Sequence, residues 1–208
     1  MFKKIILSLF LLIPLTSWAL PATQYSAYVT TTQGKETSGG KLYVDGNKVR
    51  VEAKIQGHQT YSIVRPDLGK VYSVLPEEKA YTEISVSVDE AKLMIPYNTE
   101  TKLTPAGIET IGGQACVKYQ MEGLGGTVYL FVNNNTQAPV LMTSVESGIK
   151  TEWKDVKIGP QEAKLFEPPL DYKKLELPAG LGQATTQPNL QDSPAPPADN
   201  SKPKTVVQ

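Results

Sequence analysis

Apolar and polar residues alternate along most of the first half of the chain. The alternation predicts six β-strands, at residues 25–32, 40–46, 47–55, 60–65, 70–75 and 80–86. Short turns separate them. Asp45-Gly46-Asn47 strongly favours a β-hairpin turn, because glycine and asparagine tolerate positive φ. Since loops this short join antiparallel neighbours, the first half is expected to form an antiparallel meander.

The alternation breaks at residues 88–98, VDEAKLMIPYN, which predict a short helix with Asp89 as its N-cap and Pro96 at its end. Strands resume at residues 107–111, 115–122, 126–132, 138–146 and 150–158. One short helix cannot cover a sheet of about eleven strands, so the sheet must curl on itself and enclose an apolar cavity. Two alternatives stay open: side chains fill the cavity, or it receives an apolar ligand.

The two ends of the chain differ from the domain between them. Residues 1–19, MFKKIILSLFLLIPLTSWA, have the basic start, short apolar run and small final residues of a secretory signal peptide, and no cysteine lies near the cleavage site to carry a lipid. Residues 179–208 are rich in proline and poor in large apolar residues, which predicts a disordered tail. Residues 20–178 are therefore one exported domain without a membrane span. We expect it in the periplasm, with the medium or the outer membrane as alternatives.

Charge and reactive residues argue against nucleic-acid binding and against catalysis. The chain has 21 basic and 21 acidic residues, without a basic stripe. His58 and Cys116 are each single, so a zinc site of histidines and cysteines is excluded by count. There is no G-x-S-x-G elbow or phosphate-binding glycine loop, and the adjacent carboxylates at 77–78 and 89–90 point apart. We therefore expect no enzyme, no catalytic residue, no metal and no cofactor.

The sequence also predicts the surroundings of three single residues. Cys116 is expected as a buried apolar thiol, with an intermolecular disulfide as the alternative. His58 is expected in an exposed turn. Trp153 has polar neighbours, so it is expected to cover an edge or to contact a partner.

Ten side chains are candidates for the lining of an open cavity. They come from strand faces with alternating apolar residues and from the predicted helix, whose methionine adapts to irregular ligands. The candidates are Tyr61, Ile63, Arg65, Leu93, Met94, Val117, Tyr119, Met121, Tyr129 and Phe131. Arg65 is expected at the rim. Tyr129 and Phe131 alternate along their strand with Val128, Leu130 and Val132, so one of these two sets must face the interior.

Four blocks of the sequence carry a resemblance to a known family. They are GGKLYVDGNKVRVEA, IVRPDLGKVYSVLPEEKAYTEI, GIETIGGQACVKYQM and WKDVKIGPQEAKLFEPPLDYKKLELP. Their order and spacing, from about Tyr25 to Pro178, resemble the exported bacterial family called domain of unknown function 4412. That family is similar to the lipoprotein-localisation fold of LolA, LolB and RseB. The resemblance implies a mainly β fold: a single strongly curved antiparallel sheet, an open or half barrel, with one or two short helices plugging the concave side.

The resemblance also bears on function. Members of the wider group bind acyl chains or lipoprotein segments in the hollow, whereas the closer family has no assigned activity and no ligand residue transfers to this chain. We therefore expect an exported, non-enzymatic binding protein that holds a lipid, an acyl chain or a lipoprotein segment. The alternative is a structural module or one that contacts another envelope protein, without a small ligand. A hollow smaller than about 300 Å³ would contradict the first hypothesis.

Overall fold

The computed structural model describes residues 20–123 and 125–176. The predicted signal peptide, residues 1–19, and the predicted tail, residues 179–208, lie outside these ranges. Within the described ranges, no helix is long and apolar enough to cross a membrane.

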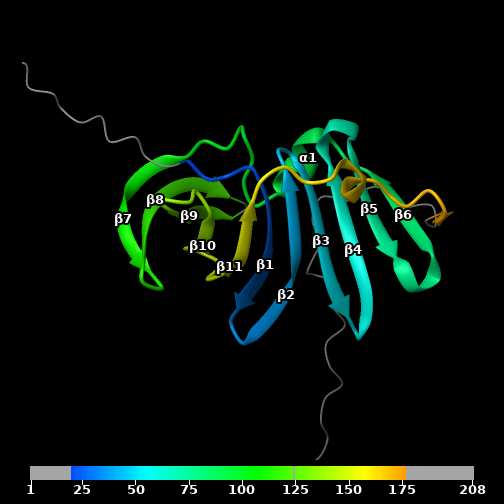
Figure 1. The fold of residues 1–208 in the computed structure, drawn as a ribbon, viewed down its shortest axis with the longest axis horizontal. Helices are drawn as coiled ribbons and strands as arrows, with labels where there is room; N and C mark the ends of the chain where they lie inside the picture. The colour runs from blue at the N-terminus through cyan, green and yellow to red at the C-terminus, as the bar shows by residue number, and fades with distance from the viewer. Residues whose placement is uncertain (1–19, 124, 177–208) are drawn as a thin grey trace, which may run out of the picture.

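Strands dominate the described part of the chain (Figure 1). They are β1 (Gln24–Gln33), β2 (Glu36–Asp45), β3 (Lys48–Ile55), β4 (His58–Arg65), β5 (Lys70–Leu75), β6 (Ala80–Ser85), β7 (Thr104–Ile111), β8 (Gln114–Gly123), β9 (Gly126–Asn133), β10 (Pro139–Ser144), β11 (Lys150–Ile158) and β12 (Lys173–Leu175). The helix α1 (Val88–Leu93) follows β6. Short 3-10 turns occur at η1 (Pro66–Leu68), η2 (Pro76–Glu78) and η3 (Ala163–Phe166).

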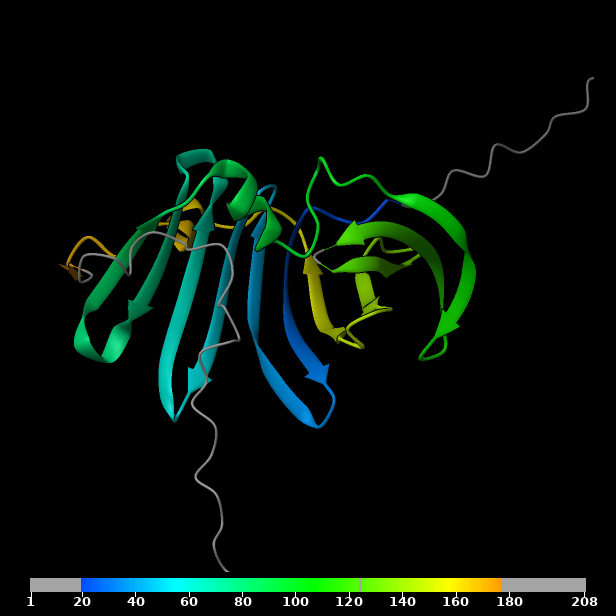
Figure 2. The ribbon, with the colours of Figure 1, turned by 180° about the vertical axis from the view of Figure 1, so that it is seen from behind.

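All twelve of these strands form one sheet, in the order β12-β6-β5-β4-β3-β2-β1-β11-β10-β9-β8-β7. Neighbours are antiparallel except β12 and β6, which run parallel. Because β1 pairs with both β2 and β11, it joins a meander of β1–β6 to a meander of β7–β11. The predicted curved, open and mainly antiparallel sheet is confirmed (Figure 2). The sequence does not predict β12, because three residues are too few to display an alternation.

The helix α1 packs on one face of the sheet, which we call the inner face; the opposite face is the outer face (Figure 2). Ala91 of α1 is fully buried there. The N-cap is Ser87, not the predicted Asp89. The Ser87 hydroxyl accepts a hydrogen bond from the Glu90 N–H at 3.1 Å, and the Glu90 carboxylate accepts one from the Ser87 N–H at 2.7 Å. This capping box satisfies two backbone donors at once, which explains the position of the helix start.

The main hydrophobic core lies on the inner face. Tyr25, Val49 and Leu130, from three different strands, are at most 1% exposed. Trp153 is also part of this core, at 5% exposed, because it pairs with Val29 across β11 and β1 and points inward. The expectation that Trp153 covers an edge or contacts a partner is therefore wrong.

A second, smaller core lies on the outer face, over β4 and β5. Residues 159–172, which we call the strap, follow β11 and run toward β12 on this side of the sheet (Figure 1). Phe166 of the strap is fully buried there. Arg50 donates a hydrogen bond to the Leu165 carbonyl at 3.3 Å, and Arg65 donates one to the Phe166 carbonyl at 3.1 Å. Two guanidinium groups thus satisfy backbone acceptors of the strap.

Candidate functional site

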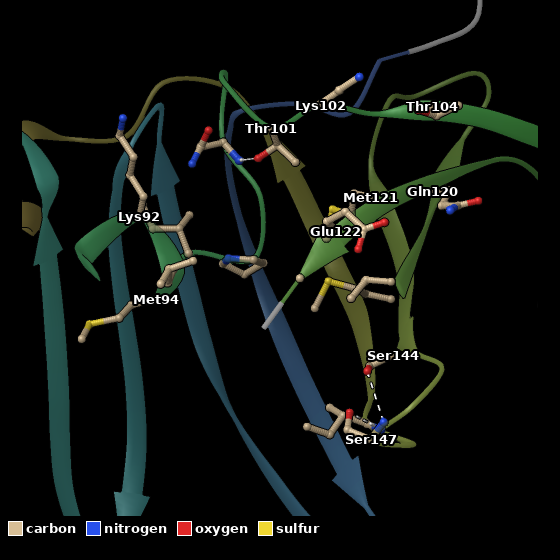
Figure 3. Close-up of a pocket in the computed structure, with 18 of the residues that line it drawn as sticks. Lys92, Met94, Thr101, Lys102, Thr104, Gln120, Met121, Glu122, Ser144 and Ser147 are labelled. Carbon is tan, nitrogen blue, oxygen red and sulfur yellow. Dashed lines mark hydrogen bonds between the residues drawn. The ribbon is translucent and has the colours of Figure 1, made fainter. Parts of the chain in front are cut away.

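A cavity of about 880 Å³ opens on the inner face, between the C-terminal end of α1 and strands β8, β9 and β10 (Figure 3). Its lining is mainly apolar. The apolar lining residues are Leu93, Met94, Ile95, Pro96, Met121, Val128, Met142 and Ile149. Hydroxyl and amide groups complete the wall, among them those of Thr31, Gln120 and Ser144. The cavity therefore offers an apolar ligand a surface on which to leave water.

Methionine is concentrated in this cavity. Met94, Met121 and Met142 are the methionines of the described ranges, and each of them lines the wall. Met94 is 49% exposed at the end of α1, whereas Met121 in β8 is buried. Because unbranched thioether side chains adapt to irregular shapes, this wall is suited to ligands of variable outline.

The residues after α1 fix the helix to the sheet. Tyr97 is buried, stacks on Tyr25 with 6.4 Å between ring centroids, and donates a hydrogen bond to the Ala22 carbonyl at 2.8 Å. The Asn98 N–H donates to the Thr101 hydroxyl at 2.8 Å. Burial raises the pKa of Tyr25 to about 12 and raises the pKa of Tyr97 well above its ordinary value, so both phenols stay neutral. This anchor holds the helical wall of the cavity in place.

Four charged residues lie in or beside the lining. Lys92 forms an ion pair with Glu100 at 2.6 Å, which raises the pKa of Lys92 and lowers the pKa of Glu100. Lys102 and Glu122 also line the cavity, and neither forms an ion pair within the described ranges. In Figure 3 the ammonium groups of Lys92 and Lys102 lie in the upper part of the view, above Met94 and Met121. The polar end of a ligand would meet Lys102 as an unneutralised cation.

The family model described as "Domain of unknown function (DUF4412)" matches residues 27–138, more than half of the chain. The chain belongs to this family. The sequence resemblance to the family is thereby confirmed. None of the curated proteins compared with the chain is significantly similar to it.

Several solved structures are similar to this DUF4412 protein at low sequence identity. An uncharacterized conserved protein from Thermus thermophilus is 15% identical, with a TM-score of 0.52, over 74% of this chain and 90% of that chain. A LolA superfamily protein from Nitrosomonas europaea is 12% identical, with a TM-score of 0.38, over 71% of this chain and 91% of that chain. The Pseudomonas aeruginosa MucA/MucB complex is 12% identical, with a TM-score of 0.42, over 84% of this chain and 68% of that chain. The likeness to the Thermus protein supports the fold alone.

Three of the ten predicted lining residues lie in the cavity wall of the DUF4412 domain: Leu93, Met94 and Met121. Val117 and Tyr119 share the inner face of β8 with Met121, but they are buried in the core and lie outside the cavity lining. The period-two pattern of β8 thus places all three on one face and does not show which of them borders open space.

Tyr129 and Phe131 lie on the outer face of β9, away from the cavity. The Lys118 ammonium lies 4.3 Å from the ring centroid of Tyr129 and 5.5 Å from that of Phe131. The opposing set of the same strand faces inward, and its member Val128 lines the cavity. The run VYLFV is apolar on both faces, so its pattern alone does not identify the inner one.

Tyr61, Ile63 and Arg65 share one face of β4, as expected, but it is the outer face under the strap. The Arg65 guanidinium donates to both carboxylate oxygens of Asp67, at 2.8 and 2.7 Å, in addition to the Phe166 carbonyl. Arg65 therefore fixes the strap and does not border the cavity. The strap has no alternation that would reveal it as a sheet cover, so the sequence does not show that this face is closed.

Met142, Ile149 and Thr31 line the cavity and are absent from the predicted set. Met142 belongs to the run PVLM, whose continuous apolar character hides its inward direction. Thr31 and Ile149 stand at strand ends near hairpins, where a sequence pattern carries little positional information.

A second cavity, of about 370 Å³, lies at the β3–β4 hairpin and includes His58. The exposed His58 ring pairs with the Glu77 carboxylate at 2.8 Å, which raises the pKa of His58 and lowers the pKa of Glu77. Ser62 and Ser73 border the same cavity, but within the described ranges no hydrogen bond joins a serine to the imidazole.

The described residues also show how the metal-ligating side chains and the thiol of this domain are placed. In the part of the chain that the structure describes, no three histidine, cysteine or carboxylate side chains lie close enough together to hold a metal ion. Cys116 is fully buried, its thiol donates to the Gln114 carbonyl at 3.5 Å, and burial raises its pKa. A thiol in this position is protonated and out of reach of another chain.

Proposed function

We propose that this protein is a non-enzymatic carrier or receptor of the cell envelope that holds an acyl chain or another elongated apolar ligand in the inner-face cavity. The observation that carries the proposal is the methionine-lined hollow between α1 and β8–β10. Its volume of about 880 Å³ exceeds the ~300 Å³ below which a small-ligand pocket is unusual.

The expected driving force is burial of ligand hydrocarbon against the apolar wall. Each buried methylene contributes about 0.8 kcal/mol, from which the entropy cost of association must be subtracted. An anionic or polar end would then lie beside Lys102, while Lys92 is already paired with Glu100. A single-chain amphiphile fits this distribution of apolar and charged groups.

Native mass spectrometry of the protein purified from the envelope of an expressing bacterium tests the proposal. We expect a reproducible extra mass that matches a lipid and disappears after delipidation, and we expect the delipidated protein to take up a fluorescent fatty acid. Absence of both would contradict the proposal and would favour the alternative, an envelope module that contacts another protein.

A pair of substitutions in the cavity wall tests where the ligand binds. Leu93 and Met94 line the cavity and are 56% and 49% exposed, so Leu93→Ser with Met94→Ser removes apolar wall at little cost in stability. We expect the fatty-acid Kd to rise about tenfold or more, because part of two apolar side chains is lost from the contact. The matched control is Ile108→Ser with Leu170→Ser, two exposed apolar residues outside the lining, for which an unchanged Kd is expected. Equal weakening in both double variants would place the ligand elsewhere.

A further inference from the structure

Five basic and aromatic side chains gather on the outer face, where β11, β1 and β2 lie side by side (Figure 1). Tyr28 of β1 pairs with Lys154 of β11 on one side and with Lys41 of β2 on the other. One step along, Ser26 is flanked by Lys157 and Tyr43. We call Tyr28, Lys41, Tyr43, Lys154 and Lys157 the outer patch. Three strands thus hold three lysines and two tyrosines in fixed register.

A β-bulge in β11 builds this patch. Lys154 and Lys157 are three residues apart, so in a regular strand they would point to opposite faces. Between them the register with β1 shifts, and Asp155 has φ of 52°. Because of the extra residue, Lys157 joins Lys154 on the outer face, while Val156 and Ile158 follow Trp153 on the inner side. Without the bulge, Lys157 would point toward the core.

None of the three lysines of the outer patch forms an ion pair within the described ranges, although Glu52 lies opposite Lys41 in the register of β2 and β3 and attracts it. The nearby acidic groups on β2, β3 and β11 have cations of their own. Glu52 pairs with Arg50 at 2.7 Å, Glu152 with Lys150 at 3.0 Å, and Asp45 with Lys48 at 3.7 Å. Asp155, at the bulge, is the carboxylate closest in sequence to the two lysines of β11. The patch therefore has a local positive excess on a chain whose overall charge is balanced.

The two tyrosines give the patch an amphipathic surface. Tyr28 is 48% exposed and lies over Gly39, where an added Cβ would come within 3.1 Å of its hydroxyl oxygen. The Lys41 ammonium lies 4.8 Å from the ring centroid of Tyr43. Aromatic rings with a polar tip, and lysines on long apolar stems, are the side chains that settle at a lipid–water interface.

We propose that the outer patch docks this protein on the surface of a bilayer that contains anionic phospholipids. The charge excess is complementary to phosphate head groups, and the tyrosines enter the interface between them. The patch occupies a broad sheet face and is not part of either cavity, so it favours an extended charged surface over a small ligand or an inserted peptide. The proposal does not depend on the ligand in the inner-face cavity.

Sedimentation with vesicles tests the proposal, using the protein purified from the envelope. We expect binding to vesicles of equal parts phosphatidylcholine and phosphatidylglycerol, little binding to phosphatidylcholine alone, and a decrease in high salt because counterions screen the charges. The triple variant Lys41→Gln, Lys154→Gln, Lys157→Gln should lower the partition coefficient about 100-fold, since each lysine near an anionic surface contributes roughly fivefold.

The matched control is Lys35→Gln, Lys54→Gln, Lys173→Gln, which removes the same charge from exposed lysines outside the patch. It should bind the anionic vesicles within about twofold of the wild type. Absence of binding to anionic vesicles would overturn the proposal, and so would an equal loss of vesicle binding in both triple variants. Binding to soluble poly-glutamate without binding to vesicles would also overturn it and would indicate an acidic protein partner. Fatty-acid uptake should be unchanged in both triple variants, so this test and that of the cavity fail separately.

Discussion

The two halves of the sheet differ in curvature and in the elements that cover them (Figure 2). In the curled half, formed by β1 and β7–β11, inner side chains such as Tyr119 and Leu130 pack in one core with Tyr97, which follows α1. In the flatter half, formed by β2–β6 and β12, α1 covers the inner face and the strap covers the outer face. The two halves therefore share one inner core around α1, and they differ on the outer face, where the strap covers the flatter half.

The largest expected effect comes from removing the strap's anchor in the flatter half. Phe166→Ala should lower the free energy of unfolding by about 3–5 kcal/mol, because the ring is fully buried and its loss leaves a cavity. Urea denaturation measures the change, and hydrogen exchange should show loss of protection first in β4 and β5. Leu170→Ala, in the same strap but fully exposed, is the control and should change stability by less than about 0.5 kcal/mol. A stable Phe166→Ala variant would mean that the outer core does not hold this half together.

The curled half should respond to Leu130→Ala with a loss of about 2–5 kcal/mol, because this side chain is fully buried within the inner core. If the strap stabilises β4 and β5 independently of the inner core, β8–β10 should lose hydrogen-exchange protection in this variant before β4 and β5 do. Ile108→Ala, at an exposed position of the edge strand β7, is the matched control. Simultaneous loss of protection in both halves would show that the sheet unfolds as one unit.

These two halves also differ in how far the sequence predicts them. Period-two alternation is a local property, so it predicts the strands and the shared face of Tyr61, Ile63 and Arg65. Which face is inner depends on what covers it, and the strap that covers β4 comes from residues about a hundred positions later. The bulge at Asp155 is likewise not predictable from the sequence. A single positive φ reverses the direction of Lys157, and the apolar pattern does not reveal it.

A smaller effect is expected from the helix that covers the inner face of the flatter half. Ser87→Ala removes the hydroxyl half of the capping box and should cost about 1 kcal/mol, whereas Ser87→Gly should cost only a few tenths. Because α1 also forms a wall of the cavity, we expect faster hydrogen exchange in α1 and weaker fatty-acid binding in the alanine variant. Unchanged exchange in α1 would mean that its packing, through Ala91, holds it without the cap.

The smallest effect is a pH dependence at the junction of β4 with the strap. Arg65 lowers the pKa of Asp67 below its ordinary value of 3.8. The carboxylate therefore contributes stability that is fully present above about pH 4 and is lost as the pH falls through the lower folded value. Since Asp67 is 46% exposed, solvent screening limits the contribution to about 0.2–1 kcal/mol. Urea midpoints of the wild type and Asp67→Asn should differ near neutral pH and converge below pH 3.8; a constant difference would exclude this ion pair as the cause.

The pairing of β1 with β11 determines the order in which this molecule can be completed. During synthesis, β1–β6 leave the ribosome in sequence, and each strand finds its neighbour within a few residues. One edge of β1 has no partner until residues 150–158 emerge, because Val29 must wait for Trp153. A nascent chain therefore has one unpaired edge of β1 through most of its translation. Because contacts over so long a sequence separation form slowly, we expect the pairing of β1 with β11 to limit the folding rate.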